Sequence, residues 1–123
     1  MATIFNTADL VAAMQRIAPV ELAEDWDNVG LLVGSAGHRV RRILLCIDLT
    51  ESVLDEAVGK KVDAIVAYHP PIFSARKTIT DADAGGRILL RAMASGIAIH
   101  SPHTAADAAR NGVNDWLAEG VGD

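Results

Sequence analysis

Two proline-flanked histidines are the residues in this sequence best suited to chemistry. His69 follows the apolar run 64–67 and precedes a Pro-Pro pair, and His103 follows Pro102 just after the run 97–100. Each run is too short for a helix and is bounded like a buried strand. Because ligands bind at the carboxyl ends of strands in open α/β sheets, we expect both imidazoles at such an edge. An imidazole on rigid backbone there suits metal ligation or proton transfer.

Asp107 adds a carboxylate to this pair. It stands four residues after His103, a spacing that brings both side chains to one face of a helical turn. Alternatively, Thr104 caps a short helix and Asp107, three residues later, completes a box-like cap. If His69, His103 and Asp107 converge on one sheet, they form the ligand set of a hydrolytic zinc, manganese or iron site, which needs about three protein ligands. For each histidine alone, the alternative is a hydrogen-bonded side chain at a strand end.

Two further polar stretches could bind ligands. The loop 74–80 carries two cations and three hydroxyl groups beside the end of the His69 strand, so Lys77 could hold an anionic group. A solvated surface loop would have the same composition. The stretch 21–28 places several carboxylates around Trp26. It could be a cation-binding patch, but we favour a solvated connection whose indole ring packs on the core.

Repeated strand-helix units must position these groups. Strands at 42–47 and 64–67 enclose a helix capped by Thr50 or Ser52, a βαβ unit that predicts parallel strands. A second helix, capped by Asp81 or Asp83 and ended by Gly96, leads to the strand 97–100. The fold class expected is α/β, with a mostly parallel sheet of repeated βα units flanked by helices, in a single domain over residues 1–123.

The flanking segments complete this prediction. A helix starts at Asn6 or Thr7 and stops before Pro19, and a glycine-bounded strand follows at 30–34. A final helix at 112–119 is expected to pack through its apolar side chains, which are Val113, Trp116 and Leu117.

Composition argues against several classes of protein. The formal net charge is −5 and no basic run occurs, which speaks against a nucleic-acid partner. No apolar span approaches the length that crosses a bilayer, and the N-terminus lacks a signal-peptide pattern, so we expect no membrane partner. The one cysteine, Cys46, lies in an apolar run and is interpreted as a small buried hydrophobe. These features predict a cytoplasmic protein.

Four motifs, at residues 24–31, 68–80, 101–107 and 112–117, resemble in their order those of the Nif-three-like family. Its members are also called GTP cyclohydrolase 1 type 2 homologs or dinuclear metal centre hexameric proteins. The resemblance implies a two-domain α/β protein with a di-metal site in its cleft, assembled as a toroidal hexamer. It covers only what corresponds to the family's N-terminal half, so the expected Nif-three-like domain lacks the C-terminal half that bears further ligands.

The resemblance also implies roles for individual residues. His69 and Asp107 match metal ligands of the family, and His103 matches the histidine beside the site. Tyr68 stands where many bacterial relatives have a histidine that contributes to the second metal. The family's remaining ligands belong to a C-terminal His-x-x-x-Glu segment that is absent from these 123 residues, and His100 could offer a substitute. The implied cofactor is a divalent metal, zinc, manganese or iron, at one or two positions per site.

Three functions follow as hypotheses. The first is a metal-dependent hydrolase, GTP cyclohydrolase-like, which acts on a C–N bond of a purine-like or other small substrate. In it, the catalytic His103 moves a proton and Lys77 binds an anionic group of the substrate. The second is a non-catalytic metal-binding or protein-interaction module, and the third is a truncated domain with an incomplete metal site. Apolar surface left uncovered by a missing half predicts self-association, so a homo-oligomer is expected.

Overall fold

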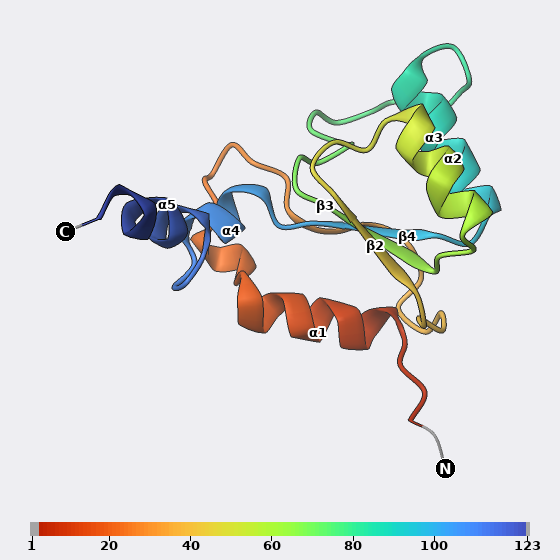
Figure 1. The fold of residues 1–123 in the computed structure, drawn as a ribbon. Helices are drawn as coiled ribbons and strands as arrows, with labels where there is room; N and C mark the ends of the chain where they lie inside the picture. The colour runs from red at the N-terminus through yellow and green to blue at the C-terminus, as the bar shows by residue number, and fades with distance from the viewer. Residues whose placement is uncertain (1–2, 123) are drawn as a thin grey trace.

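The computed structural model describes residues 3–122, and the strands and helices in this range form one sheet flanked by helices (Figure 1). The helices are α1 (Thr7–Ile17), α2 (Glu51–Gly59), α3 (Ala84–Ala94), α4 (His103–Ala108) and α5 (Val113–Val121), with a short 3-10 turn η1 (Val20–Leu22). The strands are β1 (Gly30–Val33), β2 (Ile43–Cys46), β3 (Ala64–Ala67) and β4 (Ala98–Ser101). None of the helices in residues 3–122 has the length and apolar character that a bilayer crossing requires.

The sheet confirms the predicted fold class. Its strand order is β1-β4-β3-β2, with β2, β3 and β4 parallel and β1 antiparallel to β4. Every residue of β3 and β4 is buried, as expected for strands covered on both faces. Because β3 and β4 are parallel neighbours, their carboxyl ends at Ala67 and Ser101 lie at the same edge of the sheet. His69 and His103 follow these two ends directly.

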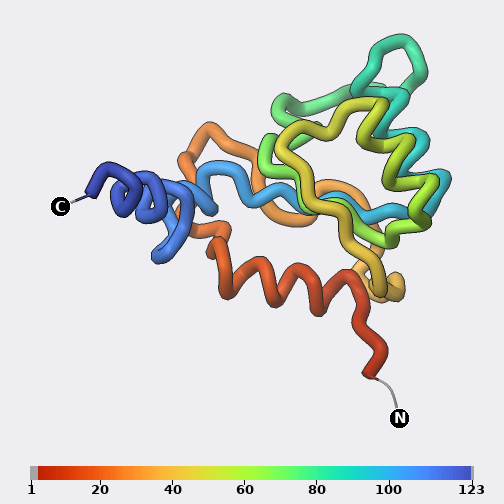
Figure 2. The backbone as a smooth tube through the Cα atoms, in the orientation of Figure 1, coloured from red at the N-terminus to blue at the C-terminus, as the bar shows by residue number. Residues whose placement is uncertain are grey.

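Each face of the sheet has its own core. On one face, α2 and α3 pack through Leu54 and Leu89 against Ile99. On the other face, α1 packs through Leu10 against Val66 and neighbouring small residues of β3 and β4. Figure 2 shows this layering, with α1 in red on one side of the sheet and α2 and α3 on the other. The layers hold the central strands rigidly and therefore fix the positions of the loops at their ends.

Local signals in the sequence predicted the helix ends well. Asn6 caps α1 and shares a capping box with Asp9. Of the alternatives left open, Thr50 caps α2 and Asp83 caps α3. Gly96 follows α3 with a φ of +67°, the left-handed conformation that a glycine after a helix commonly adopts.

Two expectations for the C-terminal part are wrong. Thr104 does not cap α4, because the helix begins one residue earlier at His103 and has no side-chain cap. The final helix α5 forms, but Trp116 and Leu117 are more than half exposed instead of packed. The reason is visible in Figure 1, where α5 extends away from the sheet beside α4 and meets no layer that could cover its apolar side chains.

Candidate functional site

Two carboxylate-histidine pairs form the centre of the candidate site. His69 Nδ1 lies 2.7 Å from Asp48 Oδ1, and His103 Nδ1 lies 2.9 Å from Asp27 Oδ1. The two imidazole rings are nearly perpendicular, with centroids 5.3 Å apart. The structure therefore brings together the two histidines that the sequence singled out, and each is held through the same ring nitrogen.

Tyr68 links Asp107 to the two histidines. Its hydroxyl donates a hydrogen bond to Asp107 Oδ1. The box-like cap that would join Thr104 and Asp107 is wrong, because α4 begins at His103 and has no side-chain cap. The tyrosine ring packs against both imidazoles, with centroid distances of 5.0 Å to His69 and 5.5 Å to His103. Burial, the hydrogen bond to Asp107 and nearby carboxylate charge raise the pKa of Tyr68 to about 12. The phenol therefore stays protonated at neutral pH and acts as a donor to Asp107.

Asp27 is the most buried carboxylate of the site, with a side chain that is 0% exposed. It accepts hydrogen bonds from His103, from the backbone N–H of Asn28 and from both the backbone N–H and the hydroxyl of Thr104. Burial alone would raise the pKa of Asp27, but these hydrogen bonds outweigh it and lower the pKa to about 2. The carboxylate is therefore ionised at neutral pH.

The stretch 21–28 agrees only in part with the solvated connection that the sequence suggested, since Glu21, Glu24 and Asp25 are exposed but the Asp27 side chain is not. The interpretation as a solvated connection is wrong for Asp27, which is buried against α4. The Trp26 ring is 61% exposed and packs beside Phe73 and His103 instead of entering the core. The physical reason is that this segment crosses the carboxyl edge of the sheet, where the histidines offer partners for both side chains.

Asp27 and Asp48 are the functional residues that the sequence analysis missed. Asp48 follows the carboxyl end of strand β2 by two residues, and His69 follows the carboxyl end of the parallel strand β3. The topology of the sheet could therefore have indicated that Asp48 lies beside His69. Asp27 meets His103 across 76 residues of chain, and no spacing rule connects them.

Lys77 lies outside this group of rings and carboxylates. It lines a polar hollow of about 400 Å³ on the loop between β3 and α3, together with Phe73, Arg76 and Asp83. Arg76 is paired with Asp83 at 2.7 Å. The loop meets the site through Phe73, which packs against Trp26. The role of Lys77 in holding an anionic group stays a prediction.

His100 does not act as the substitute ligand that the resemblance suggested. It is 2% exposed within β4, and its Nδ1 has no hydrogen-bond partner among residues 3–122. Because side chains alternate along a strand, His100 shares the face of Ala98, which α1 covers. Its ring is therefore enclosed in the fold and not presented to a ligand.

Replacing His100 with leucine should remove part of the protein's sensitivity to mild acid. Burial lowers the pKa of His100 from its ordinary 6.5, so the unfolded chain binds a proton before the folded chain does as the pH falls. Stability should consequently fall below pH 6.5, by at most about 1.4 kcal/mol per pH unit from this group. Urea unfolding at pH 7.5 and 5.5 should show a smaller difference for His100→Leu than for the wild type. Equal differences would contradict this, and His38→Leu, at an exposed loop position, is the control.

The donor atoms near Tyr68 fit a divalent metal in type but not in number. The pair Asp48 and His69 leaves His69 Nε2 as the remaining ring donor, and a ligating histidine commonly holds its other nitrogen on a carboxylate in this way. Asp107 keeps its second oxygen, Oδ2, beside the bond from Tyr68. Within residues 3–122, however, no group of three or more His, Cys, Asp or Glu side chains is placed to hold a metal together.

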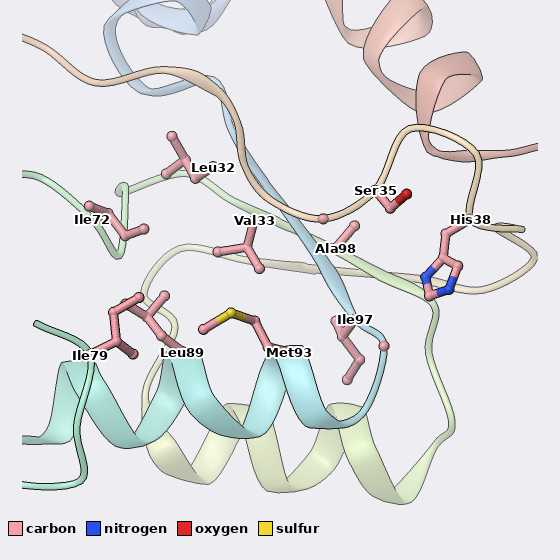
Figure 3. A pocket seen from close by; sticks show the side chains of 12 residues that line it. Leu32, Val33, Ser35, His38, Ile72, Ile79, Leu89, Met93, Ile97 and Ala98 are labelled. Carbon is pink, nitrogen blue, oxygen red and sulfur yellow. The ribbon is translucent and has the colours of Figure 1, made fainter.

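An apolar hollow of about 480 Å³ lies elsewhere, between α3 and the β1 side of the sheet (Figure 3). Its walls are mainly aliphatic side chains, among them Val33, Ile72, Leu89 and Met93, with His38 at one end. It contains none of the ring and carboxylate groups described above, so we do not include it in the site.

Comparison with known proteins gives consistent matches over almost the whole chain. Residues 5–122 match the family model described as Duf34/NIF3 (NGG1p interacting factor 3). The "NIF3-like protein 1" of Rattus norvegicus is 50% identical over 114 residues, which cover 92% of this chain and 30% of the relative. The "GTP cyclohydrolase 1 type 2 homolog" of Bacillus subtilis is 36% identical over 121 residues, which cover 98% of this chain and 32% of the relative.

A solved structure of a Bacillus cereus protein related to NIF3 is similar throughout this fold. The two are 37% identical with a TM-score of 0.89, and the match covers 98% of this chain and 34% of the other. The chain thus spans about a third of the length of these relatives.

Proposed function

The chain belongs to the DUF34/NIF3 family, and from this premise we propose that it forms part of a divalent-metal site in a hydrolase. The observation that carries the proposal is the Asp48 and His69 pair beside the Tyr68 and Asp107 pair. In this arrangement His69 Nε2 and Asp107 Oδ2 are the donor atoms for zinc, manganese or iron, with one or two metals per site. When bound, such a metal supplies Lewis acidity to a hydrolytic reaction.

The remaining ligands must come from beyond a single copy of residues 3–122. A catalytic metal takes about three protein ligands, and the described residues contribute fewer. The relatives extend well beyond the region matched here. Further metal ligands, from a segment like their unmatched part or from a second copy of this chain, would complete the ligand set.

The proposed reaction is hydrolysis of a C–N bond in a purine-like or other small substrate. Support for this class comes from the name of the Bacillus subtilis relative, a GTP cyclohydrolase 1 type 2 homolog. In this chain, His103 exchanges a proton with the substrate through Nε2, because Asp27 occupies its Nδ1. Lys77, on the loop that meets the site through Phe73, binds an anionic group of the substrate.

Metal titration of the purified chain tests this proposal. Calorimetric titration with Zn²⁺, Mn²⁺ or Fe²⁺ should give weak but saturable binding, and His69→Ala and Asp107→Ala should each weaken it by about tenfold or more, since each removes a ligand. His38→Ala removes an exposed histidine of a distant loop and should leave the affinity unchanged. Equal binding by all four proteins would contradict the proposal, as would an absence of binding by the wild type.

A second candidate, a non-catalytic metal-binding or protein-interaction module, is favoured by the incomplete ligand set and by one apolar surface. Edge strand β2 and the residue that follows it present Ile43, Leu45 and Ile47 to solvent, with Leu45 76% exposed. Leu44 and Cys46 point to the opposite face and pack with the core beneath α2 and α3. An exposed edge strand with an apolar face readily pairs with another chain. The proposed partner is a second copy of this chain. The toroidal hexamer and the cytoplasmic location, which were expected from the sequence, stay predictions.

Leu45→Lys should reduce self-association of the chain. The substitution places a charge at the centre of the exposed apolar face of β2, where a partner surface would have to desolvate it. Light scattering over a concentration series should give masses above 13.0 kDa for the wild type and close to it for the variant. Leu117→Lys, at an exposed leucine of α5, the helix that extends away from the sheet (Figure 1), is the matched control. A wild type that stays monomeric at high concentration would rule out this interface.

A further inference from the structure

The hydrogen bonds of Asp27 determine where the protons on its neighbours lie. An ionised carboxylate only accepts hydrogen bonds and offers about four lone-pair positions. All four are used here. Oδ1 receives the N–H of Asn28 at 2.8 Å and faces His103 Nδ1 at 2.9 Å, and Oδ2 receives the N–H of Thr104 at 3.1 Å and its hydroxyl at 2.5 Å. Because this carboxylate cannot donate, the hydrogen at the His103 contact must belong to Nδ1.

The Thr104 hydroxyl supports this direction independently. Its oxygen accepts the backbone N–H of Glu24 at 3.0 Å, so its own hydrogen is available for Asp27. The hydrogen bonds therefore run in one direction, from Glu24 to Thr104 and from Thr104 to Asp27. Asp27 is the acceptor at the end of this chain, as it is at the contact with His103.

His103 is held in a backbone conformation that a residue with a side chain seldom adopts. Its φ is +25°, and it opens α4, whose first turn lacks a side-chain cap from its own segment. Asp27 binds both the His103 ring and the N–H of the next residue, Thr104, and so clamps both sides of this strained position. Strain that is maintained by several contacts is commonly found at functional residues.

The surrounding rings keep the imidazole in this orientation. Trp26, Tyr68 and His69 approach the His103 ring with centroid distances of 6.2, 5.5 and 5.3 Å. The side chain remains 18% exposed, so a small molecule can reach it. A ring flip that exchanged the two nitrogens would break the bond to Asp27 and would have to pass these three neighbours.

We propose that Asp27 is a positioning residue that fixes the tautomer of His103, so that the neutral imidazole carries its hydrogen on Nδ1 and presents Nε2 as an acceptor. In this state His103 takes up a proton or accepts a hydrogen bond at Nε2, and it donates from that atom only after it has been protonated. The proposal deepens the proposed function and rests on it for the use made of Nε2. The tautomer itself follows from the contacts of this chain alone.

Nitrogen NMR of the metal-free chain tests the assignment. With ¹⁵N-labelled histidine near pH 8, long-range ¹H–¹⁵N spectra distinguish the protonated ring nitrogen from the bare one, and a His103→Gln variant identifies the His103 signals. The wild type should show bare Nε2. Asp27→Leu keeps much of the side-chain volume but offers Nδ1 no acceptor, so a population with bare Nδ1 is expected to appear. Asp25→Asn, at an exposed neighbouring carboxylate, and Thr104→Val, which keeps the contact between His103 and Asp27, should both retain bare Nε2.

Each outcome of this experiment decides the proposal. Bare Nδ1 in the wild type would overturn it, and so would an unchanged spectrum in folded Asp27→Leu. If Asp27→Leu fails to fold, the wild-type spectrum decides the question, since bare Nε2 supports the proposal and bare Nδ1 overturns it. Loss of metal binding in the titration would not alter this spectrum, so failure of the proposed function and failure of this inference can be told apart.

Discussion

Gly86→Ala should lower the free energy of unfolding by about 3 kcal/mol. Gly86 lies in the first turn of α3, where an added Cβ would overlap the backbone carbonyl oxygen of Thr80. A backbone atom cannot rotate away as a side chain can, so either the helix or the loop before it must move. The Gly86 N–H also donates to the capping carboxylate of Asp83 at 2.7 Å, and the shift would weaken this cap.

Gly59→Ala is the matched control for that substitution. Gly59 is the last residue of α2, and a Cβ there meets nothing within 4 Å. Alanine is favoured over glycine in helices by up to about 1 kcal/mol, so this variant should be as stable as the wild type or more stable. Urea unfolding of the three proteins measures the difference. If Gly86→Ala is as stable as Gly59→Ala, the close approach of α3 to the loop does not exist in solution.

The fold was largely predictable because its signals are local or depend on parallel pairing. The cap at Asn6, the stop at Gly96 and the buried runs of β3 and β4 are each visible within a few residues. The sequence did not predict how far α5 extends from the sheet. Its spacing of Trp116 and Leu117 is that of a packed helix, but packing depends on a neighbouring layer, which sequence periodicity does not report.

The candidate site was predictable only where topology alone brings residues together. His69 and His103 meet because parallel β3 and β4 end at one edge of the sheet, and each histidine directly follows its strand. Asp27 comes from a segment without regular structure, whose path across that edge no local pattern specifies. A run of acidic residues around Trp26 suggested a solvated loop, since the sequence does not distinguish the one buried carboxylate from its exposed neighbours.

Asp27→Ala should destabilise the chain by about 3 to 5 kcal/mol, which is among the largest effects expected of any single substitution at the site. Removing the carboxylate leaves several donors without an acceptor, and each buried unsatisfied group costs about 1 to 3 kcal/mol unless water reaches it. It also releases the strained backbone at His103, which offsets a part of the loss. Asp25→Ala, two residues earlier and exposed, should stay within about 0.5 kcal/mol of the wild type in urea unfolding.

Unfolding measured at a series of acidic pH values distinguishes what the charge of Asp27 contributes to stability from what the shape of its side chain contributes. The pKa of about 2 in the folded chain lies below the ordinary 3.8, so the unfolded chain binds a proton first as the pH falls. The stabilisation by Asp27 is therefore complete above pH 3.8 and is lost as the pH falls toward 2. Asp27→Asn keeps the shape but cannot titrate, so its stability should fall less steeply than that of the wild type over this window. Parallel losses in the two proteins would mean that the carboxylate is not held by its four donors in solution, and the tautomer of His103 would then lose its physical basis.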